Sequence, residues 1–474
     1  MRRGVGMIIG LLALCTWALA QPAPDTVLPQ RAADFWRLVA EAPTVQDSQL
    51  EALFSASSIE RIGRDGLRDL LGQLHEDLGD TVVKLTPTLV QDQGGSQLQY
   101  ELPDGRRLGM RLTLEETAER RIARFGVRFL PPAVPSVPGP EQPAAIADHV
   151  RAEAAAGRFS GAVLVARGAT PVQALAVGLA DRVTGRANTL DTPINLGSMN
   201  KMFTAIAIGQ LQAAGRLDWT DRVGRHLPQL PNAKIRDEVS VEQLLTHTSG
   251  VGSYWNDRYQ SARKQIDDLA GFLATFVDEP LLFEPGQGNE YSNGGPVILG
   301  LIIEAISGQS YYDYMREQLY EPAGMTHSGH FLSTDQEAGF AIGYRRDESG
   351  QWQDNGDWLG LRGSAAGGGY ASANDLLAFA QALGDGRLLD RATLEQLWQA
   401  RAELGPDFGY GYLFGTGRIN GQRWVGHNGG APGISADFRY YPDSGLTIIV
   451  LANQDQAAMP MSEWLNALLT ATAN

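Results

Sequence analysis

The chain has 474 residues but very little cysteine. Its single cysteine, Cys15, lies in an apolar N-terminal segment, so a chain that loses this segment has no thiol. This excludes disulfides, a cysteine nucleophile and cysteine-ligated metals in the mature protein. His-Glu-x-x-His and comparable ligand spacings are also missing, so no catalytic metal is expected.

Positive charge is also scarce. The chain has 39 lysines and arginines against 54 acidic residues, and its formal net charge is −15. A nucleic-acid partner requires a basic surface, and anionic lipid attracts basic segments, so neither partner is expected. The simplest role of this charge is solubility.

No long hydrophobic run follows the N-terminus. The apolar stretch from Gly4 to Leu14 is too short to span a bilayer. It follows Arg2 and Arg3 and precedes the small residues around Ala20, which is the pattern of a secretory signal peptide. The sequence therefore predicts a signal over residues 1–20 and an exported protein, periplasmic or extracellular, without an integral membrane segment after cleavage. The alternative is an uncleaved anchor.

The length predicts two or three domains. Prolines are dense over residues 131–145, which indicates a semi-rigid extended linker. This linker separates an N-terminal domain over residues 21–130 from a larger domain over residues 146–474.

The smaller domain shows two helical patterns, over residues 32–42 and 59–78, followed by extended segments between residues 81 and 129. Helices followed by an antiparallel meander resemble the cystatin or NTF2-like α+β folds. The segment contains no catalytic constellation, and a ligand-binding or partner-binding role is the functional alternative.

The larger domain has strand patterns at both of its ends. Residues 161–167 and 172–179 form the first pair, and residues 434–441 and 446–451 form the second. Mostly helical segments lie between them. The pattern predicts an α/β (α+β) domain whose single sheet takes strands from both ends.

A candidate nucleophile stands at the start of an apolar helical pattern. Ser198 and Lys201 are three residues apart, so a helix places the lysine amine beside the serine oxygen. Only four of the 39 basic residues are lysines, and arginine cannot act as a base, so a lysine here is suggestive. The same spacing occurs at Ser261 and Lys264, in a polar segment that reads as a solvated helix face. The Gly-x-Ser-x-Gly elbow of α/β-hydrolases is missing.

Two later motifs single out the first pair. Tyr291-Ser-Asn293 precedes an apolar helix, and His427-Asn-Gly429 precedes the two C-terminal strands. Ser-x-x-Lys, Tyr-x-Asn and a final Lys-Thr-Gly or His-x-Gly follow in this order in penicillin-recognising enzymes. The chain therefore resembles the branch that includes class C β-lactamases and related esterases and peptidases, over residues 146–469. Two other segments also match these motifs, Tyr254-Trp-Asn256 and His327-Ser-Gly329. We set them aside as decoys, because neither has the flanking helix or strand pattern of the first two matches.

The resemblance implies the β-lactamase and penicillin-binding-protein fold, an antiparallel sheet flanked by helices with a helical subdomain. It also implies an acyl-enzyme mechanism without a cofactor. By this resemblance Ser198 attacks the acyl carbonyl, while Lys201 and Tyr291 move the proton. The resemblance also assigns the backbone N–H groups of Ser198 and Gly430 to the oxyanion hole. It gives four residues to the substrate-binding positions: Asn293, His427, Gly429 and Gly430.

His427 replaces the lysine that many relatives have. A histidine is mostly neutral near pH 7 and attracts a substrate carboxylate less than a lysine does. We therefore expect a serine hydrolase of the esterase, amidase or D-peptidase type acting on a small-molecule or peptide substrate. The alternatives are a class C-like β-lactamase or DD-carboxypeptidase, and a non-catalytic binding protein that retains the fold. His247 is expected to have a structural role, bonding the backbone.

Overall fold

The computed structural model describes residues 27–471, apart from residues 43, 79–85, 93–94, 103–106, 131–133, 135–136, 348 and 406. The predicted signal peptide lies outside the described residues, and so do residues 131–133 and 135–136 of the predicted linker. The end of that linker is helical instead of extended, because residues 139–145 belong to a short 3-10 helix and to the first helix of the second unit. The chain divides into two compact units at Pro132 and Ala133, and each is described here by itself.

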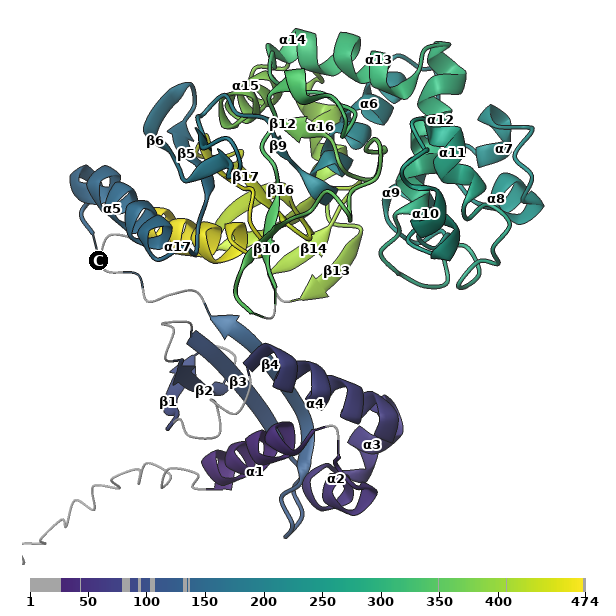
Figure 1. Cartoon of the computed structure of the whole chain (residues 1–474). Helices are drawn as coiled ribbons and strands as arrows, with labels where there is room; N and C mark the ends of the chain where they lie inside the picture. The colour runs from purple at the N-terminus through teal and green to yellow at the C-terminus, as the bar shows by residue number, and fades with distance from the viewer. Residues whose placement is uncertain are drawn as a thin grey trace, which may run out of the picture. The chain divides into compact units, whose positions relative to one another are not determined.

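The first unit packs helices on a four-stranded sheet (Figure 1). The strands pair antiparallel in chain order, which is the meander that the sequence predicts. The short second helix was not predicted. The elements are α1 (Val27–Glu41), α2 (Asp47–Leu53), α3 (Ala56–Ile62), α4 (Arg64–Leu78), β1 (Thr88–Asp92), β2 (Gly95–Glu101), β3 (Arg107–Leu114) and β4 (Ile122–Leu130).

The core of this unit lies between α1 and one face of the sheet. Successive strand residues face opposite sides, so Leu108 and Met110 of β3 reach the same core. Phe35 and Trp36 of α1 meet them there with less than 2% of their surface exposed. These contacts give the first unit a hydrophobic core of its own.

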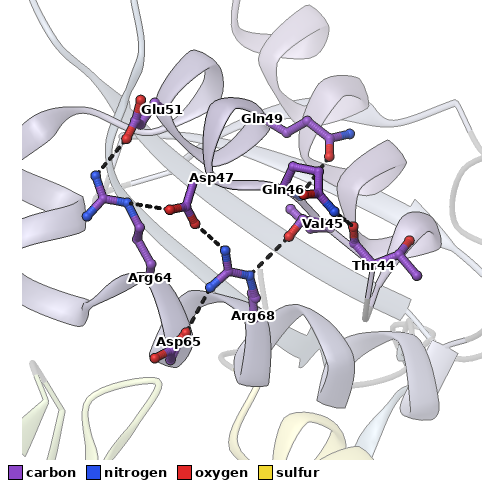
Figure 2. Close-up of polar contacts among 9 residues, drawn as sticks. All are labelled: Thr44, Val45, Gln46, Asp47, Gln49, Glu51, Arg64, Asp65 and Arg68. Atoms are coloured by element: carbon purple, nitrogen blue, oxygen red, sulfur yellow. Dashed lines mark hydrogen bonds and ion pairs between the residues drawn. The ribbon is translucent and has the colours of Figure 1, made fainter.

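Polar contacts join α2 to α4 at the surface (Figure 2). The Arg64 guanidinium lies 2.6 Å from the Glu51 carboxylate and 3.5 Å from that of Asp47. Arg68 also pairs with Asp47, and its Nε donates to the Val45 carbonyl at 3.0 Å. Because these side chains are partly exposed, the network fixes the position of α2 more than it stabilises the fold.

The second unit is built on an eight-stranded antiparallel sheet, with the order β13-β14-β15-β16-β17-β18-β5-β6. The first two strands in sequence therefore pair beside the last one, as the sequence predicts. The bounds are β5 (Gly161–Arg167), β6 (Thr170–Val177), β13 (Ala402–Gly405), β14 (Phe408–Tyr410), β15 (Gly415–Ile419), β16 (Gln422–Ala431), β17 (Ile434–Tyr441) and β18 (Leu446–Ala452).

Helices cover both faces of this sheet, because strands such as β5 have apolar side chains on both faces. Its Ala162 and Leu164 pack in the large core with helices α6 (Lys201–Ala213) and α15 (Ala373–Gly384). Val163 and Val165, on the other face, pack with helices α5 (Gln142–Ala155) and α17 (Ala458–Thr470). Figure 1 shows α5 and α17 together on that face. A strand buried on both faces is a nearly continuous apolar run, and β5 is apolar from Gly161 to Ala166, before the exposed Arg167.

The segment between β6 and β13 is mostly helical. It contains the helices α7 (Val223–His226), α8 (Ala233–Glu238), α9 (Val241–Leu245), α10 (Asp257–Ala262), α11 (Leu269–Ala274), α12 (Gly294–Ser307), α13 (Tyr311–Met315), α14 (Glu321–Ala323) and α16 (Arg391–Trp398), the turns η3 (Gly197–Asn200), η4 (Arg316–Tyr320) and η5 (Gln336–Ala338), and the short strands β7 (Leu179–Asp181), β8 (Arg186–Ala187), β9 (Ile194–Asn195), β10 (Tyr344–Arg346), β11 (Trp352–Asp354) and β12 (Tyr370–Ala371). One further turn, η2 (Gly139–Glu141), precedes α5. No helix within the described residues is both long enough and apolar enough to cross a membrane.

Candidate active site

Ser198 stands on a tight turn at the start of α6. Gly197 precedes it with φ +51°, a left-handed conformation that favours glycine. The backbone N–H of Gly197 donates to Asn195 Oδ1 at 3.0 Å, which fixes the entry to the turn. The Ser198 side chain stays half-buried at the N-terminal end of the helix, where the helix dipole favours negative charge.

The Lys201 amine is fully buried beside Ser198. Its Nζ lies 3.2 Å from Ser198 Oγ, 2.8 Å from Asn293 Oδ1 and 2.6 Å from the Ala366 carbonyl oxygen. No carboxylate among the described residues pairs with it. Burial without a counter-charge disfavours the ammonium, and this desolvation holds the pKa of Lys201 well below its usual value.

Tyr291 and Asn293 come from the segment that enters α12. The Tyr291 hydroxyl is hydrogen-bonded to the Ser198 side chain, and Lys201 Nζ lies 4.7 Å from the centre of its ring. Tyr291 is 44% exposed, yet atoms around its hydroxyl exclude water, and this desolvation raises the pKa of the phenol. Asn293 donates from Nδ2 to Ser253 Oγ at 3.2 Å, so its Oδ1 faces Lys201.

His247 holds this segment from behind. Its Nδ1 accepts the Ser292 backbone N–H at 3.1 Å, and its ring centre lies 4.6 Å from that of Tyr291. The residue is buried and has φ +60°, which is uncommon for a residue other than glycine. The expected backbone hydrogen bond is therefore present, and it falls on the residue between Tyr291 and Asn293.

His427 lies on β16 with both ring nitrogens close to protein atoms. Tyr410 Oη is 2.8 Å from its Nε2, and the Asn428 carbonyl faces Nδ1. Burial lowers the pKa of His427 to about 4, so the imidazole is neutral near pH 7. Its side chain does not line the pocket described below, although its ring centre is 6.5 Å from that of Tyr291. Tyr410, its partner, was not predicted because no motif contains it.

Gly429 and Gly430 bring β16 against the turn that carries the serine. A Cβ on Gly429 would meet the Leu196 carbonyl oxygen at 1.8 Å, so only glycine fits. A Cβ on Gly197 would be 3.0 Å from the Gly430 nitrogen. The backbone of β16 therefore runs beside Ser198, as an oxyanion donor from Gly430 requires.

A pocket of about 380 Å³ opens at Ser198. Asn293, Tyr291 and Gly430 line it on the catalytic side. The remaining wall is rich in aromatic residues, and sequence reasoning missed it because its members lie on several segments far apart in the sequence. They are Tyr254, Trp255, Tyr259, Phe272, Phe331, Trp358 and Tyr370.

None of the three alternative motifs places its residues beside Lys201 as Tyr291 and Asn293 are placed. Ser261 and Lys264 are exposed on and just after α10, as expected of a solvated helix face. The backbone N–H of His327 donates to the Asp375 carboxylate at 2.6 Å, away from Ser198. Tyr254 lines the pocket, but its hydroxyl lies 3.4 Å from Ser364 Oγ and not beside Lys201.

The beta-lactamase family model matches residues 146–472, which is most of the chain and all within the second unit. The chain belongs to the beta-lactamase family. Members of this family are serine hydrolases, and the antiparallel sheet with helices on both faces is the fold that the sequence predicts.

Relatives within the beta-lactamase family include both penicillin-binding proteins and an esterase. The chain is 31% identical to penicillin-binding protein 4* of Bacillus subtilis, over 63% of this chain and 69% of the relative. It is 31% identical to esterase EstB of Burkholderia gladioli, over 54% of this chain and 75% of the relative. Among solved structures, a penicillin-binding protein from Bacillus halodurans is 31% identical, with a TM-score of 0.63, and covers 68% of this chain and 99% of its own.

Proposed function

We propose that the chain is a serine acyl hydrolase of the esterase, amidase or D-peptidase type, with Ser198 as its nucleophile. The observation that carries this proposal is the uncharged surrounding of the serine. Lys201 is buried without a carboxylate partner, and the pKa of His427 is lowered to about 4. Such surroundings favour a neutral Lys201 amine, which can accept the proton of the Ser198 hydroxyl.

The hydrogen bonds of Lys201 support a role as the proton acceptor. A neutral amine has two N–H donors and one lone pair. Asn293 Oδ1 and the Ala366 carbonyl accept the two N–H groups, so the lone pair is left for the Ser198 hydroxyl. This arrangement makes Lys201 the general base.

The reaction then proceeds by acyl transfer. Ser198 Oγ forms a bond to the carbonyl carbon while its proton passes to Lys201, and the backbone N–H groups of Ser198 and Gly430 stabilise the oxyanion. The bond to the leaving group breaks as Tyr291 donates a proton to it, and Lys201 returns a proton to Tyr291. Water attacks the acyl-enzyme by the reverse route and releases the acid. No step needs a cofactor.

The neutral third motif favours an ester or amide over a β-lactam. The carboxylate of a β-lactam or of a peptide C-terminus needs a positive partner at this position, and His427 is uncharged near pH 7. Similarity to an esterase of this family supports the same choice.

Labelling tests whether the chain is an enzyme. We expect a fluorophosphonate to form an adduct on the peptide that contains Ser198, and the Ser198→Ala variant to lose it. Loss of the nucleophile should lower turnover by a factor on the order of 10⁶. Folded protein without an adduct would favour the rival function, a binding protein that retains the fold.

Substrate comparison tests the reaction class. We expect hydrolysis of a short-chain ester to exceed that of a cephalosporin, with a D-Ala-D-Ala peptide as the third arm. Fast cephalosporin turnover without ester hydrolysis would overturn the proposal in favour of a class C-like β-lactamase.

We also propose that the protein is exported and that cleavage leaves Gln21 as the first residue. N-terminal sequencing of the protein from periplasmic and extracellular fractions tests this. A retained N-terminal segment in a membrane fraction would show that it serves as an anchor.

A further inference from the structure

The wall of the pocket opposite the catalytic groups is made of aromatic rings in mutual contact. Trp255 and Trp358 stack with ring centres 4.7 Å apart and an angle of 21° between their planes. Trp255 also packs edge-on against Tyr259 at 4.8 Å, and Tyr254 packs edge-on against Phe272 at 5.1 Å. These contacts hold the rings as one preformed surface, named here the aromatic wall.

Two hydrogen bonds tie the aromatic wall to the catalytic groups. Asn293 donates to Ser253 Oγ at 3.2 Å, and Ser253 directly precedes Tyr254 and Trp255. On the other side, the Tyr254 hydroxyl contacts Ser364 Oγ at 3.4 Å, two residues before the Ala366 carbonyl that binds Lys201. Because Ser198 lines the same pocket as these rings, a group attached to the reacting carbonyl lies within reach of the aromatic wall.

The pocket offers almost no charge to a ligand. Of the described residues that line it, Arg362 alone is charged. Its guanidinium packs 3.6 Å from the centre of the Tyr312 ring and donates from Nε to the His330 carbonyl, and neither residue lines the pocket. A carboxylate on this side of the substrate would lose water and would find only this one guanidinium, whose Nε and ring contact are already used.

The opposite side of Ser198 differs from the aromatic wall. Tyr291 packs against His247, which in turn contacts Tyr410, and Tyr410 is hydrogen-bonded to His427. Tyr291 lines the pocket, whereas His247, Tyr410 and His427 do not. Tyr291 is the proposed donor to the leaving group, so the leaving group lies on its side. The aromatic wall is left for the acyl part of the substrate.

We propose that the acyl group of the substrate is uncharged and carries an aryl ring that packs on the aromatic wall. This inference rests on the proposed function and adds the substrate class. A volume of about 380 Å³ lies within the range of small-molecule sites and accommodates an aryl ring with its linkage to the carbonyl. Contacts between aromatic rings add to the burial of their area, so an aryl group gains over a saturated ring of similar size.

Esters that share one leaving group test the acyl preference. The full mature chain is given the 4-nitrophenyl esters of acetic, phenylacetic, cyclohexylacetic and (4-carboxyphenyl)acetic acid. We expect kcat/KM for phenylacetate to exceed that for cyclohexylacetate about 2- to 10-fold, from the extra stabilisation of aromatic pairs. The carboxylated ester should react slower than phenylacetate by a factor on the order of 100.

Matched tryptophan variants connect the preference to the wall. Trp358→Ala and the milder Trp255→Leu should abolish the preference for phenylacetate over cyclohexylacetate, because each removes a ring on which the aryl group packs. Trp352→Ala is the control, because Trp352 contacts the Arg182 and Arg346 guanidinium groups outside the pocket. This variant should keep the preference.

The outcomes separate the two proposals. Hydrolysis of acetate with no preference for the aryl ester, or with fast turnover of the carboxylated ester, would overturn the aryl assignment and leave the serine hydrolase intact. An unchanged preference in both pocket variants would also overturn it. If no ester reacts and fluorophosphonate does not label Ser198, the hydrolase proposal fails and the aryl assignment fails with it.

Discussion

At the scale of single residues, the proposed chemistry depends on a lysine whose charged form is disfavoured by burial. Lys201 has a carbonyl, an amide oxygen and a hydroxyl around its amine, and burial lowers its pKa. A base works only when deprotonated, so activity is present above the pKa of Lys201 and is lost as the pH falls through it. The phenol of Tyr291, whose pKa is raised, keeps its proton at neutral pH and can donate it.

The pH profile of ester hydrolysis should reflect the lowered pKa of Lys201. An ordinary lysine would make kcat/KM rise steadily up to about pH 10. With the lowered pKa of Lys201, we expect kcat/KM for 4-nitrophenyl acetate, corrected for spontaneous hydrolysis, to level off before about pH 10 and to stay level up to that pH. Lys201→Arg, which cannot act as a base, should lower kcat by a factor on the order of 10² to 10⁴. A tenfold rise per pH unit that continues up to about pH 10 would contradict a neutral lysine.

His247 is predicted to support Tyr291 and Asn293 through the residue between them. His247→Phe keeps a ring against Tyr291 but removes Nδ1, the acceptor of the buried Ser292 N–H. An unsatisfied buried N–H costs about 1–3 kcal/mol, so we expect the free energy of unfolding to fall by that amount and kcat to fall with it. Urea unfolding and ester kinetics measure both quantities.

The control for this variant is His327→Phe. The His327 side chain is 47% exposed, and its motif is one of the decoys. A surface change of this kind should shift stability by less than about 0.5 kcal/mol and leave the kinetics unchanged. Equal effects of the two variants would show that His247 has no special place in the site.

At the scale of elements, the site is a contact between the turn before α6 and strand β16. The contact is possible because glycines let the two backbones meet. Gly429 lies against the Leu196 carbonyl, whereas a Cβ on Gly430 would find its nearest neighbour, the Ile434 carbonyl oxygen, at 3.9 Å. There is therefore no room for a side chain at Gly429, whereas there is room for a Cβ at Gly430.

This difference gives a matched pair of variants. Gly429→Ala would have to push β16 away from the serine turn, so we expect a loss of more than about 3 kcal/mol in stability or an inactive site. Gly430→Ala keeps the backbone N–H that is proposed for the oxyanion hole and should retain acylation within a factor of about 10. Thermal unfolding and the rate of fluorophosphonate labelling compare them. If both variants acylate at the native rate, the turn and the strand are less tightly packed than the structure indicates.

Sequence motifs predicted the side chains of the site better than its surroundings. Ser198, Lys201, Tyr291 and Asn293 were found because their chemistry restricts the residue type at fixed spacing. The Ala366 carbonyl could not be found in this way, since any residue supplies a carbonyl. Tyr410 and the aromatic wall were missed because tertiary folding alone brings their segments together.

The same limit applied to the elements. Long periodic patterns predicted α1, the meander and the terminal strands of the large sheet, because burial imposes their spacing over many residues. The short α2 has too few turns to show a period, and contacts with α4 position it instead. The resemblance of the first unit to cystatin or NTF2-like folds stays a prediction.

At the scale of the whole molecule, each of the two units has a hydrophobic core of its own, and only the second unit contains residues of the candidate active site. The first unit buries its own apolar cluster, and among the described residues none before Val134 belongs to the cores of the second unit. Every residue placed at the site belongs to the second unit, within Asn195–Ile434. The first unit is therefore not needed to assemble the catalytic groups.

A truncated chain tests this independence. A protein that begins at Ala133 retains the complete large sheet and both of its helical layers, so we expect it to fold and to hydrolyse 4-nitrophenyl acetate with kcat/KM within about 2-fold of the full mature chain. Small substrates report on the site itself, and larger acyl donors report on any effect of the first unit on access. If the truncated protein is folded by circular dichroism and labels at Ser198 but loses turnover of a large ester alone, the first unit takes part in recognition. Loss of acetate hydrolysis in a folded truncated chain would instead show that the first unit is required for catalysis, contrary to the separation of the cores.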